Sequence, residues 1–136
     1  MIRKQFTLYL ENKPGVLASI SRLLATAKVN IDGISAYSSA DVGLVQVVVS
    51  NAAATRKALN RAGIPFTAQD VVLVTLPNEI GSLAAMASKL SRSGVNINYI
   101  YATGCTCTHG CRCNVIVSAP DLKKVEKVWK MAEKEL

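Results

Sequence analysis

Apolar and polar positions along the first half of the chain follow two rhythms, one with the period of a strand and one with the period of a helix. The run Phe6-Thr-Leu-Tyr-Leu10 alternates as a strand does, and the apolar residues from Val16 to Leu24 recur at helical spacing. A break that ends in Gly15 separates the two patterns. The elements predicted for this half are a strand at 6–10, a helix from 16, strands at 29–37 and 44–49 joined by a hairpin at 38–43, and a helix at 52–62 that Gly63 ends.

The second half of the chain repeats this order. Residues 64–69 lead without a flexible linker into a β-rich run at 70–76. The elements predicted after it are a helix at 80–91, strands at 95–102 and 114–118, and an amphipathic helix at 121–136 whose apolar stripe is Leu122, Val125, Val128, Trp129 and Ala132. Nothing remains after Leu136 for a last strand, so we expect the second copy to lack it and to leave an edge that a neighbour covers.

The two halves are copies of one module, because residues of the first recur 66 positions later without a gap. The recurring residues include apolar positions and turn positions together, which is hard to obtain by chance. They are Asn12/Asn78, Gly15/Gly81, Leu17/Leu83, Ala18/Ala84, Leu24/Leu90, Val29/Val95, Asn30/Asn96 and Ile31/Ile97.

This order predicts an α+β fold of two ferredoxin-like βαββαβ modules in tandem, at 1–69 and 70–136, each an antiparallel sheet with its helices on one face. Modules of this size are marginal alone, so we expect burial against each other or in a homodimer. The apolar residues are mainly Val, Ile, Leu and Ala with few aromatics, which suits a sheet covered by helices.

The net charge of +7 changes this interpretation little. The basic residues are scattered over both halves without an aromatic-interleaved patch, so a solvated surface is favoured and nucleic acid is not expected as a partner. No apolar run approaches a membrane span, and the start Met1-Ile-Arg-Lys-Gln lacks the apolar stretch of a signal peptide. We therefore expect no membrane contact and a cytoplasmic protein.

A strand, a turn that ends in Gly, a helix and then Val-Asn-Ile is a pattern that resembles the ACT domain, a small-molecule-sensing module of amino-acid metabolism. Both copies carry it, through 12–17 with 29–31 and through 78–83 with 95–97, although Ile80 stands where Pro is usual. The resemblance covers nearly the whole chain and implies a stand-alone regulatory protein with no catalytic activity.

The resemblance also implies where an amino acid or related metabolite binds, between the Gly turn of one module and the Val-Asn-Ile segment of another. A Gly at a helix start lets a carboxylate approach unpaired backbone N–H groups, although turn geometry alone also explains a Gly and an Asn at these positions. The candidate ligand-binding residues are Asn12, Lys13, Pro14, Gly15, Val16, Leu17, Asn30, Ile31, Asn78, Glu79, Ile80, Gly81, Ser82, Leu83, Asn96 and Ile97.

The second copy departs from the first in a cysteine-rich β-hairpin at 104–114, which holds every Cys and the only His of the chain. A three-residue loop at 108–110 would pair Cys107 with Cys111 and Cys105 with Cys113, with all four sulfurs on one face. Three hypotheses compete: a soft metal site, zinc first and then copper(I), iron or an iron–sulfur cluster; a disulfide or redox switch; and inert buried thiols. His109 is a candidate fifth ligand, although a polar turn residue is the favoured interpretation.

Two functions follow from these features. The first is a non-catalytic sensor of an amino acid or similar metabolite, in which the cysteine hairpin adds metal or redox input. The second is a metal-binding or metal-sensing protein that uses the same scaffold to dimerise. An enzyme is not expected, because the sequence offers one His, no acidic pair in a motif and no phosphate-binding Gly loop.

Overall fold

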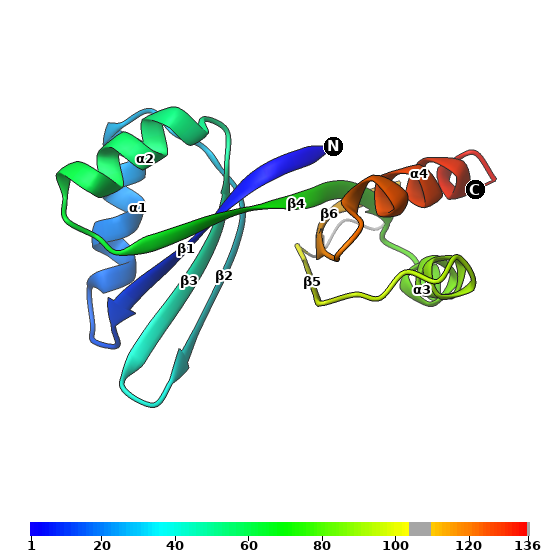
Figure 1. Ribbon diagram of the computed structural model, residues 1–136, viewed down its shortest axis with the longest axis horizontal. Helices are drawn as coiled ribbons and strands as arrows, with labels where there is room; N and C mark the ends of the chain where they lie inside the picture. The colour runs from blue at the N-terminus through cyan, green and yellow to red at the C-terminus, as the bar shows by residue number, and fades with distance from the viewer. Residues whose placement is uncertain (104–109, 136) are drawn as a thin grey trace. The chain divides into compact units, whose positions relative to one another are not determined.

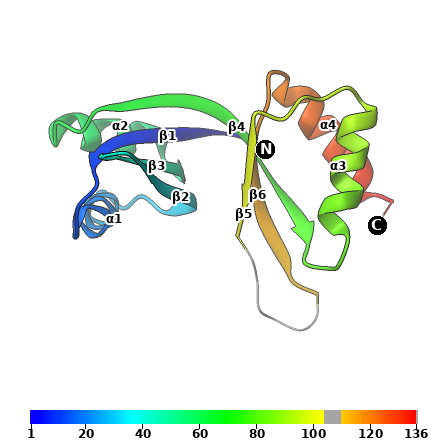
Figure 2. The same cartoon turned by 90° about the horizontal axis from the view of Figure 1, so that it is seen from below.

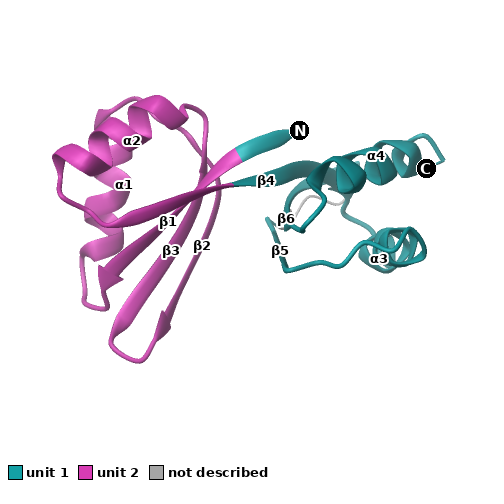
Figure 3. Ribbon diagram, viewed as in Figure 1, with its two compact units in different colours: residues 1–3, 70–136 teal, residues 4–69 magenta. Residues whose placement is uncertain are grey.

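The computed structural model describes residues 1–103 and 110–135, which form the helices and strands shown in Figure 1. In chain order they are β1 (Ile2–Glu11), α1 (Val16–Thr26), β2 (Ile31–Ser39), β3 (Val42–Val49), α2 (Ala52–Arg61), β4 (Phe66–Pro77), α3 (Ser82–Arg92), β5 (Tyr99–Ala102), β6 (Arg112–Ser118) and α4 (Leu122–Glu133). The chain divides into two compact units, coloured separately in Figure 3. Unit 2 comprises Lys4–Gln69, and unit 1 comprises Asp70–Leu136 together with Met1–Arg3.

Unit 2 is a βαββαβ unit whose strands are hydrogen-bonded in the order β2, β3, β1 and the beginning of β4. The pairs Leu8 with Val45 and Phe6 with Val47 set the β1–β3 register. Side chains of such antiparallel pairs lie on the same face of the sheet, and both pairs are buried. Helices α1 and α2 cover this face (Figure 1), where they contribute Ile20, Leu24 and Leu59 to one core.

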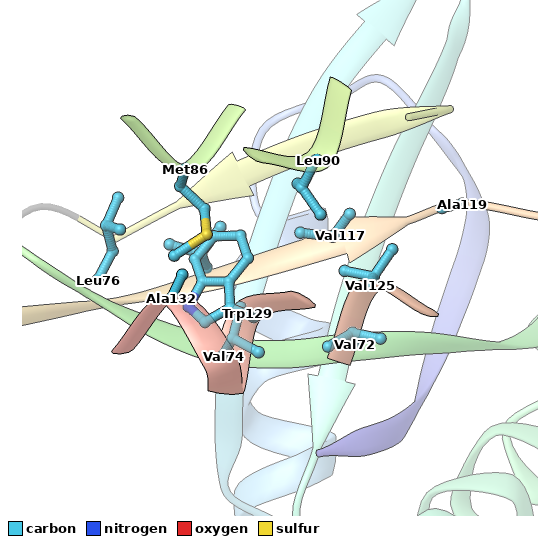
Figure 4. Close-up of a cluster of buried hydrophobic side chains, with 11 residues drawn as sticks. Val72, Val74, Leu76, Met86, Leu90, Val117, Ala119, Val125, Trp129 and Ala132 are labelled. Atoms are coloured by element: carbon cyan, nitrogen blue, oxygen red, sulfur yellow. The ribbon is translucent and has the colours of Figure 1, made fainter. Parts of the chain in front are cut away.

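Unit 1 has the same arrangement, with strands in the order β4, β6 and β5 and helices α3 and α4 on one face of the sheet (Figure 2). Its core is shown in Figure 4. Trp129 of α4 lies among Val74, Met86 and Ala132 and is 1% exposed. Counted from the N-caps of the two helices, Asn51 of α2 and Asp121 of α4, Trp129 stands at the position that Leu59 has in α2.

The fourth strand of unit 1 comes from the start of the chain. Met1 and Leu73 exchange both backbone hydrogen bonds, with Leu73 N donating to Met1 O at 2.8 Å and the Met1 ammonium donating to Leu73 O at 2.9 Å. That exchange is the pattern of an antiparallel pair. The segment 70–136 therefore lacks a last strand of its own, as the sequence predicts, and residues 1–3 occupy the edge that it leaves.

Beyond Leu73, the edge of β4 receives a side chain in place of a strand. The indole Nε1 of Trp129 donates to the backbone carbonyl of Thr75 at 2.7 Å. The Thr75 hydroxyl also lies 3.0 Å from Arg112 Nε, and Arg112 forms an ion pair with Glu133 at 2.9 Å. One buried tryptophan thus fills the core and satisfies a strand carbonyl as well.

Several element boundaries differ from the sequence prediction, among them the start of β1 at Ile2 instead of 6 and the start of β4 at Phe66 instead of 70. Strand β5 begins at Tyr99 instead of 95, because Val95 and Ile97 pack against the core without belonging to the strand. Helix α3 begins at Ser82, after Gly81 in the left-handed conformation, so Ile80 lies in the turn and is fully exposed. Among the described residues, no helix is long and apolar enough to cross a membrane.

Candidate functional site

A cavity of about 360 Å³ lies in unit 2, where β1 ends and α1 begins. The end of β1, the turn and the first residues of α1 form one side, and the β2–β3 hairpin forms the other. We call it the unit 2 pocket. Its lining residues are Leu10, Glu11, Asn12, Lys13, Val16, Leu17, Ala36, Tyr37, Ser38, Gly43, Leu44 and Val45.

A cavity of about 270 Å³ occupies the equivalent place in unit 1, between the end of β4, the start of α3 and the strands β5 and β6. We call it the unit 1 pocket. Its described lining residues are Leu76, Pro77, Asn78, Glu79, Ser82, Leu83, Ile100, Tyr101, Ala102, Cys113 and Val115.

The two pockets are built from corresponding positions of the repeat. Leu10 pairs with Gly43 in unit 2 and Leu76 pairs with Cys113 in unit 1, so the strand register itself makes Cys113 the counterpart of Gly43. The corresponding lining residues are Leu10/Leu76, Glu11/Pro77, Asn12/Asn78, Lys13/Glu79, Val16/Ser82, Leu17/Leu83, Ala36/Ala102, Gly43/Cys113 and Val45/Val115. Two copies of the module have therefore kept a cavity at the same place although their linings differ.

The turn at each pocket depends on a glycine in the left-handed region. Gly15 has φ +88° and Gly81 has φ +85°, each immediately before a helix and without a side-chain cap. A Cβ at either position would meet no atom within 4 Å, so backbone conformation and not crowding requires the glycine. The first turns of both helices also lack acidic residues, so no side chain of those turns neutralises the helix N-terminus.

The structure brings most of the predicted turn residues to the pockets. Asn12, Lys13, Val16 and Leu17 line one pocket, and Asn78, Glu79, Ser82 and Leu83 line the other. Four predicted residues lie in the turns without lining the cavities: Pro14, Gly15, Ile80 and Gly81.

The Val-Asn-Ile segments lie elsewhere in their own units. Ile31 pairs with Val49, at the end of the sheet opposite to Leu10 and Gly43. Ile31 and Ile97 pack against the cores, and the Asn30 amide donates to Asp32 at 2.7 Å. Asn30 and Asn96 therefore do not meet the Gly turn of the same unit.

Sequence reasoning missed the hairpin side of each pocket. Ala36 and Val45 in unit 2, and Ala102 and Val115 in unit 1, close the cavities opposite the turns. The signal that could have found them is their register, since Val45 and Val115 pair with the strand that runs into the turn.

The charged groups differ between the pockets. In unit 2, Lys13 Nζ lies 3.0 Å from Glu11 Oε2, so the two charges compensate each other. In unit 1 the only described charged side chain of the lining is that of Glu79, which forms no ion pair with the described residues. Burial raises the pKa of the Tyr101 phenol, and Tyr99 adds to the effect.

Two of the four cysteines are described, and both lie next to the unit 1 pocket. Cys111 is disulfide-bonded, and Cys113 is a half-buried free thiol 3.6 Å from the Leu76 carbonyl oxygen. The Asn78 N–H donates to Cys111 O at 3.0 Å, and the Asn78 amide lies 3.8 Å from Cys111 Sγ. The cysteine-rich hairpin is thus hydrogen-bonded, through Cys111, to the turn that lines the pocket.

The predicted metal site falls partly outside the described residues, because Cys105, Cys107 and His109 belong to 104–109. Within 1–103 and 110–135, no group of three or more His, Cys, Asp or Glu side chains is arranged to hold a metal ion. The last pair of the β5–β6 ladder is Ala102 with Val115. The predicted pairs Cys107 with Cys111 and Cys105 with Cys113 each include a residue outside the described residues.

Known protein families include one that matches this chain. A family model described as "ACT domain pair" matches residues 1–128. The chain belongs to the ACT domain family. The match spans both repeats, and the fold predicted from the resemblance, two ferredoxin-like ACT modules in tandem, is confirmed.

Solved structures of other proteins have a similar fold. Protein BT0572 from Bacteroides thetaiotaomicron is 30% identical, with a TM-score of 0.86 over 98% of this chain and 90% of that one. The regulatory subunit of aspartate kinase from Thermus thermophilus is 18% identical, with a TM-score of 0.71 over 98% of this chain and 94% of that one. The corresponding subunit from Thermus flavus is 19% identical, with a TM-score of 0.63 over 97% and 95%. A comparison with curated protein sequences found no match.

Proposed function

We propose that this ACT pair is a non-catalytic regulatory protein that binds an amino acid or a related small metabolite at the unit 1 and unit 2 pockets. The observation that carries the proposal is the recurrence of one cavity, at the junction of strand, Gly turn and helix, in both copies of the module. A structural neighbour with the same fold is the regulatory subunit of an amino-acid-metabolising kinase, which supports a regulatory role.

The chemistry of the turn suits a carboxylate. The N–H groups of Leu17 and Ala18 at the start of α1 have no acceptor among the described residues, and those of Leu83 and Ala84 at the start of α3 are in the same situation. Unpaired N–H groups at a helix N-terminus favour an anion through both hydrogen bonding and the helix dipole. The side chain of the metabolite would then enter the apolar cavity behind the turn.

A second copy of the chain is part of this proposal. Because Asn30 and Asn96 lie away from the pocket of their own unit, they contribute to a ligand site only from another module. A homodimer supplies such a module from a second chain. Light scattering after size exclusion should then give twice the chain mass, and a monomer at all concentrations, with and without ligand, would rule out a second chain as its source.

Thermal shift with the proteinogenic amino acids tests the binding proposal. A ligand present at 100 times its dissociation constant should add about 2.7 kcal/mol to the free energy of unfolding. Val16→Glu and Ser82→Glu place a carboxylate at the first residue of each helix, which the helix dipole tolerates but which repels an anionic ligand. Each substitution should abolish the rise in melting temperature that comes from ligand bound at its own pocket.

Ala53→Glu is the matched control, because Ala53 is an exposed residue in the first turn of α2 and lines neither pocket. It should leave the ligand response unchanged. A ligand response that survives Val16→Glu combined with Ser82→Glu would place the binding site elsewhere.

A second candidate function is metal or redox sensing at the cysteine hairpin, and the contacts of Asn78 and Cys113 favour it. Cys111 is hydrogen-bonded to Asn78 of the turn, and the Cys113 thiol lines the unit 1 pocket. A change in the oxidation or metal binding of these sulfurs would therefore alter residues that line the pocket. In this proposal the Cys111 disulfide either opens and closes as a redox switch or, once reduced, allows Cys105, Cys107, Cys111 and Cys113, with His109 as a further candidate, to hold zinc or another soft metal.

Native mass spectrometry of protein purified without oxygen separates these cases. Bound metal adds a stoichiometric mass that Cys105→Ser with Cys107→Ser removes, whereas each disulfide lowers the mass by two hydrogens. A metal-free protein whose mass is unchanged by an oxidant would leave metabolite binding as the only function proposed.

A further inference from the structure

The unit 1 and unit 2 pockets share their apolar walls and differ at their rims. The apolar pairs Leu10/Leu76, Leu17/Leu83, Ala36/Ala102 and Val45/Val115 recur in both walls, and Asn12/Asn78 recurs in the turn, so each pocket offers an aliphatic group the same four contacts. The differing pairs are Glu11/Pro77, Lys13/Glu79, Val16/Ser82 and Gly43/Cys113.

The rims differ in charge. The unit 2 rim carries one cation and one anion, Lys13 and Glu11, at 3.0 Å from each other. At the position of Lys13 the unit 1 rim carries Glu79, and Pro77 replaces the other charged residue. The unit 1 pocket therefore has one uncompensated negative charge among its described lining residues, whereas the charges of the unit 2 rim cancel.

The rims also differ in space. Cys113 has a side chain where Gly43 has none. Gly43 lies on β3, which pairs with the end of β1, and Cys113 lies on β6, which pairs with the end of β4. The cavity volumes follow the same order, about 270 Å³ in unit 1 and about 360 Å³ in unit 2. An additional acidic group on a ligand would meet both less room and a repelling carboxylate in unit 1.

We propose that the two pockets select different ligands within the same binding mode, a deepening that rests on the function proposed above. The unit 2 pocket accepts a larger ligand that carries a second anionic group. Lys13 can release the exposed carboxylate of Glu11 and pair with that group of the ligand instead. The unit 1 pocket takes a smaller ligand with an uncharged aliphatic side chain and rejects a second negative charge. One chain would thus respond to two metabolites.

The cysteine of the unit 1 pocket allows the charge selection to be measured without knowing either ligand. Gly43→Cys places a thiol at the matching position of unit 2, where a Cβ would lie at an ordinary contact distance of 3.4 Å from Leu10 O. Trypsin leaves position 43 and Cys113 on separate peptides, each without another cysteine, since Arg112 precedes Cys113. Both thiols are then followed in one protein by peptide mass spectrometry.

The probes are methanethiosulfonate reagents that carry a trimethylammonium or a sulfonate group, and the neutral methyl reagent corrects for accessibility. At low ionic strength, the cation-to-anion ratio of labelling rates should be about three- to tenfold higher at Cys113 than at position 43. Glu79→Lys should lower the ratio at Cys113 and leave position 43 unchanged, and Lys13→Glu should raise the ratio at position 43 alone.

Equal ratios at the two thiols, or ratios that neither charge substitution moves, would overturn the proposal. Failure of the proposed function has a different signature, because labelling is measured without metabolite. If no amino acid shifts the melting temperature while the ratios differ as expected, the pockets differ in charge selection but do not sense amino acids.

Discussion

Unit 1 and unit 2 have the same fold, but they obtain the fourth strand of the sheet from different parts of the chain. In unit 2 the fourth strand follows α2 directly along the chain, as the beginning of β4. In unit 1 it comes from residues 1–3, and Met1 is separated from its partner Leu73 by 72 positions in the sequence. A repeat can therefore keep its fold while the source of a whole strand changes.

Equivalent residues of α2 and α4 hold this strand in chemically different ways. Arg56 lies over the rings of Phe6 and Phe66 at 5.6 Å from each centroid, and so holds the strand that begins at Phe66. Glu126, at the corresponding position of α4, forms an ion pair with the Met1 ammonium at 2.7 Å. A cation–π contact in one unit and an ion pair in the other serve the same connection.

The largest difference between the units should appear at the core position that holds Trp129 in one and Leu59 in the other. Trp129→Ala should lower the free energy of unfolding by about 3–5 kcal/mol through the cavity alone. Trp129→Phe keeps most of the ring but leaves the Thr75 carbonyl without its donor, and should cost about 1–3 kcal/mol. Urea denaturation followed by circular dichroism measures both.

Leu59→Met is the matched control, because it nearly conserves volume and Leu59 has no hydrogen bond to lose; we expect less than about 1.5 kcal/mol. If Trp129→Phe costs no more than this control, Trp129 acts as a core residue only, and the edge of β4 does not depend on it.

The sequence predicted the parts of the fold that local patterns encode. Helical spacing after Gly15 and Gly81 located α1 and α3, and the repeat itself predicted two modules of one kind. The pairing of Met1 with Leu73 could not be predicted, because contacts between distant segments leave no periodicity and the start of the chain does not alternate clearly.

The candidate site divides in the same way. The turn side of each pocket was predicted, since a turn is a local feature. The hairpin side was not, because Val45 and Val115 reach the cavity only through strand register. The role of Asn30 and Asn96 stays a prediction, because each lies at the end of its sheet opposite to the turn.

An intermediate effect is expected from removing the strand that unit 1 borrows. Deletion of residues 1–3 removes the backbone hydrogen bonds to Leu73 and the ion pair to Glu126. At about 0.5–1.5 kcal/mol for each hydrogen bond, the loss should be about 1–3 kcal/mol. Hydrogen exchange should show faster exchange in β4 beyond Asp70.

Unit 2 provides the internal control for that deletion, because β3 of unit 2 pairs with β1 from Gln5 onward. Amides of β3 should keep their protection. Equal loss of protection in β3 and in β4 beyond Asp70 would mean that residues 1–3 are not specific to unit 1, and the comparison of strand sources would fail.

The smallest expected effect is a pH dependence that belongs to unit 1. The Met1 ammonium, by its hydrogen bond and its charge, lowers the pKa of the Glu126 carboxyl below its usual range, with a smaller contribution from Lys130. Because the folded pKa is lowered, the stabilisation is fully present above the unfolded value of about 4.3 and is lost as the pH falls through the folded pKa. Unit 2 has Arg56 at the equivalent position and therefore no carboxyl group there.

Glu126→Gln should therefore reduce the loss of stability on acidification below about pH 4.5, measured by urea denaturation of a chain that begins at Met1. Glu79→Gln removes an acidic side chain that forms no ion pair with the described residues, and it serves as the control. The effect should be small, because the pair is partly exposed and salt screens it. A Glu126→Gln profile that matches the control at low salt would show that the contact with Met1 does not hold the strand.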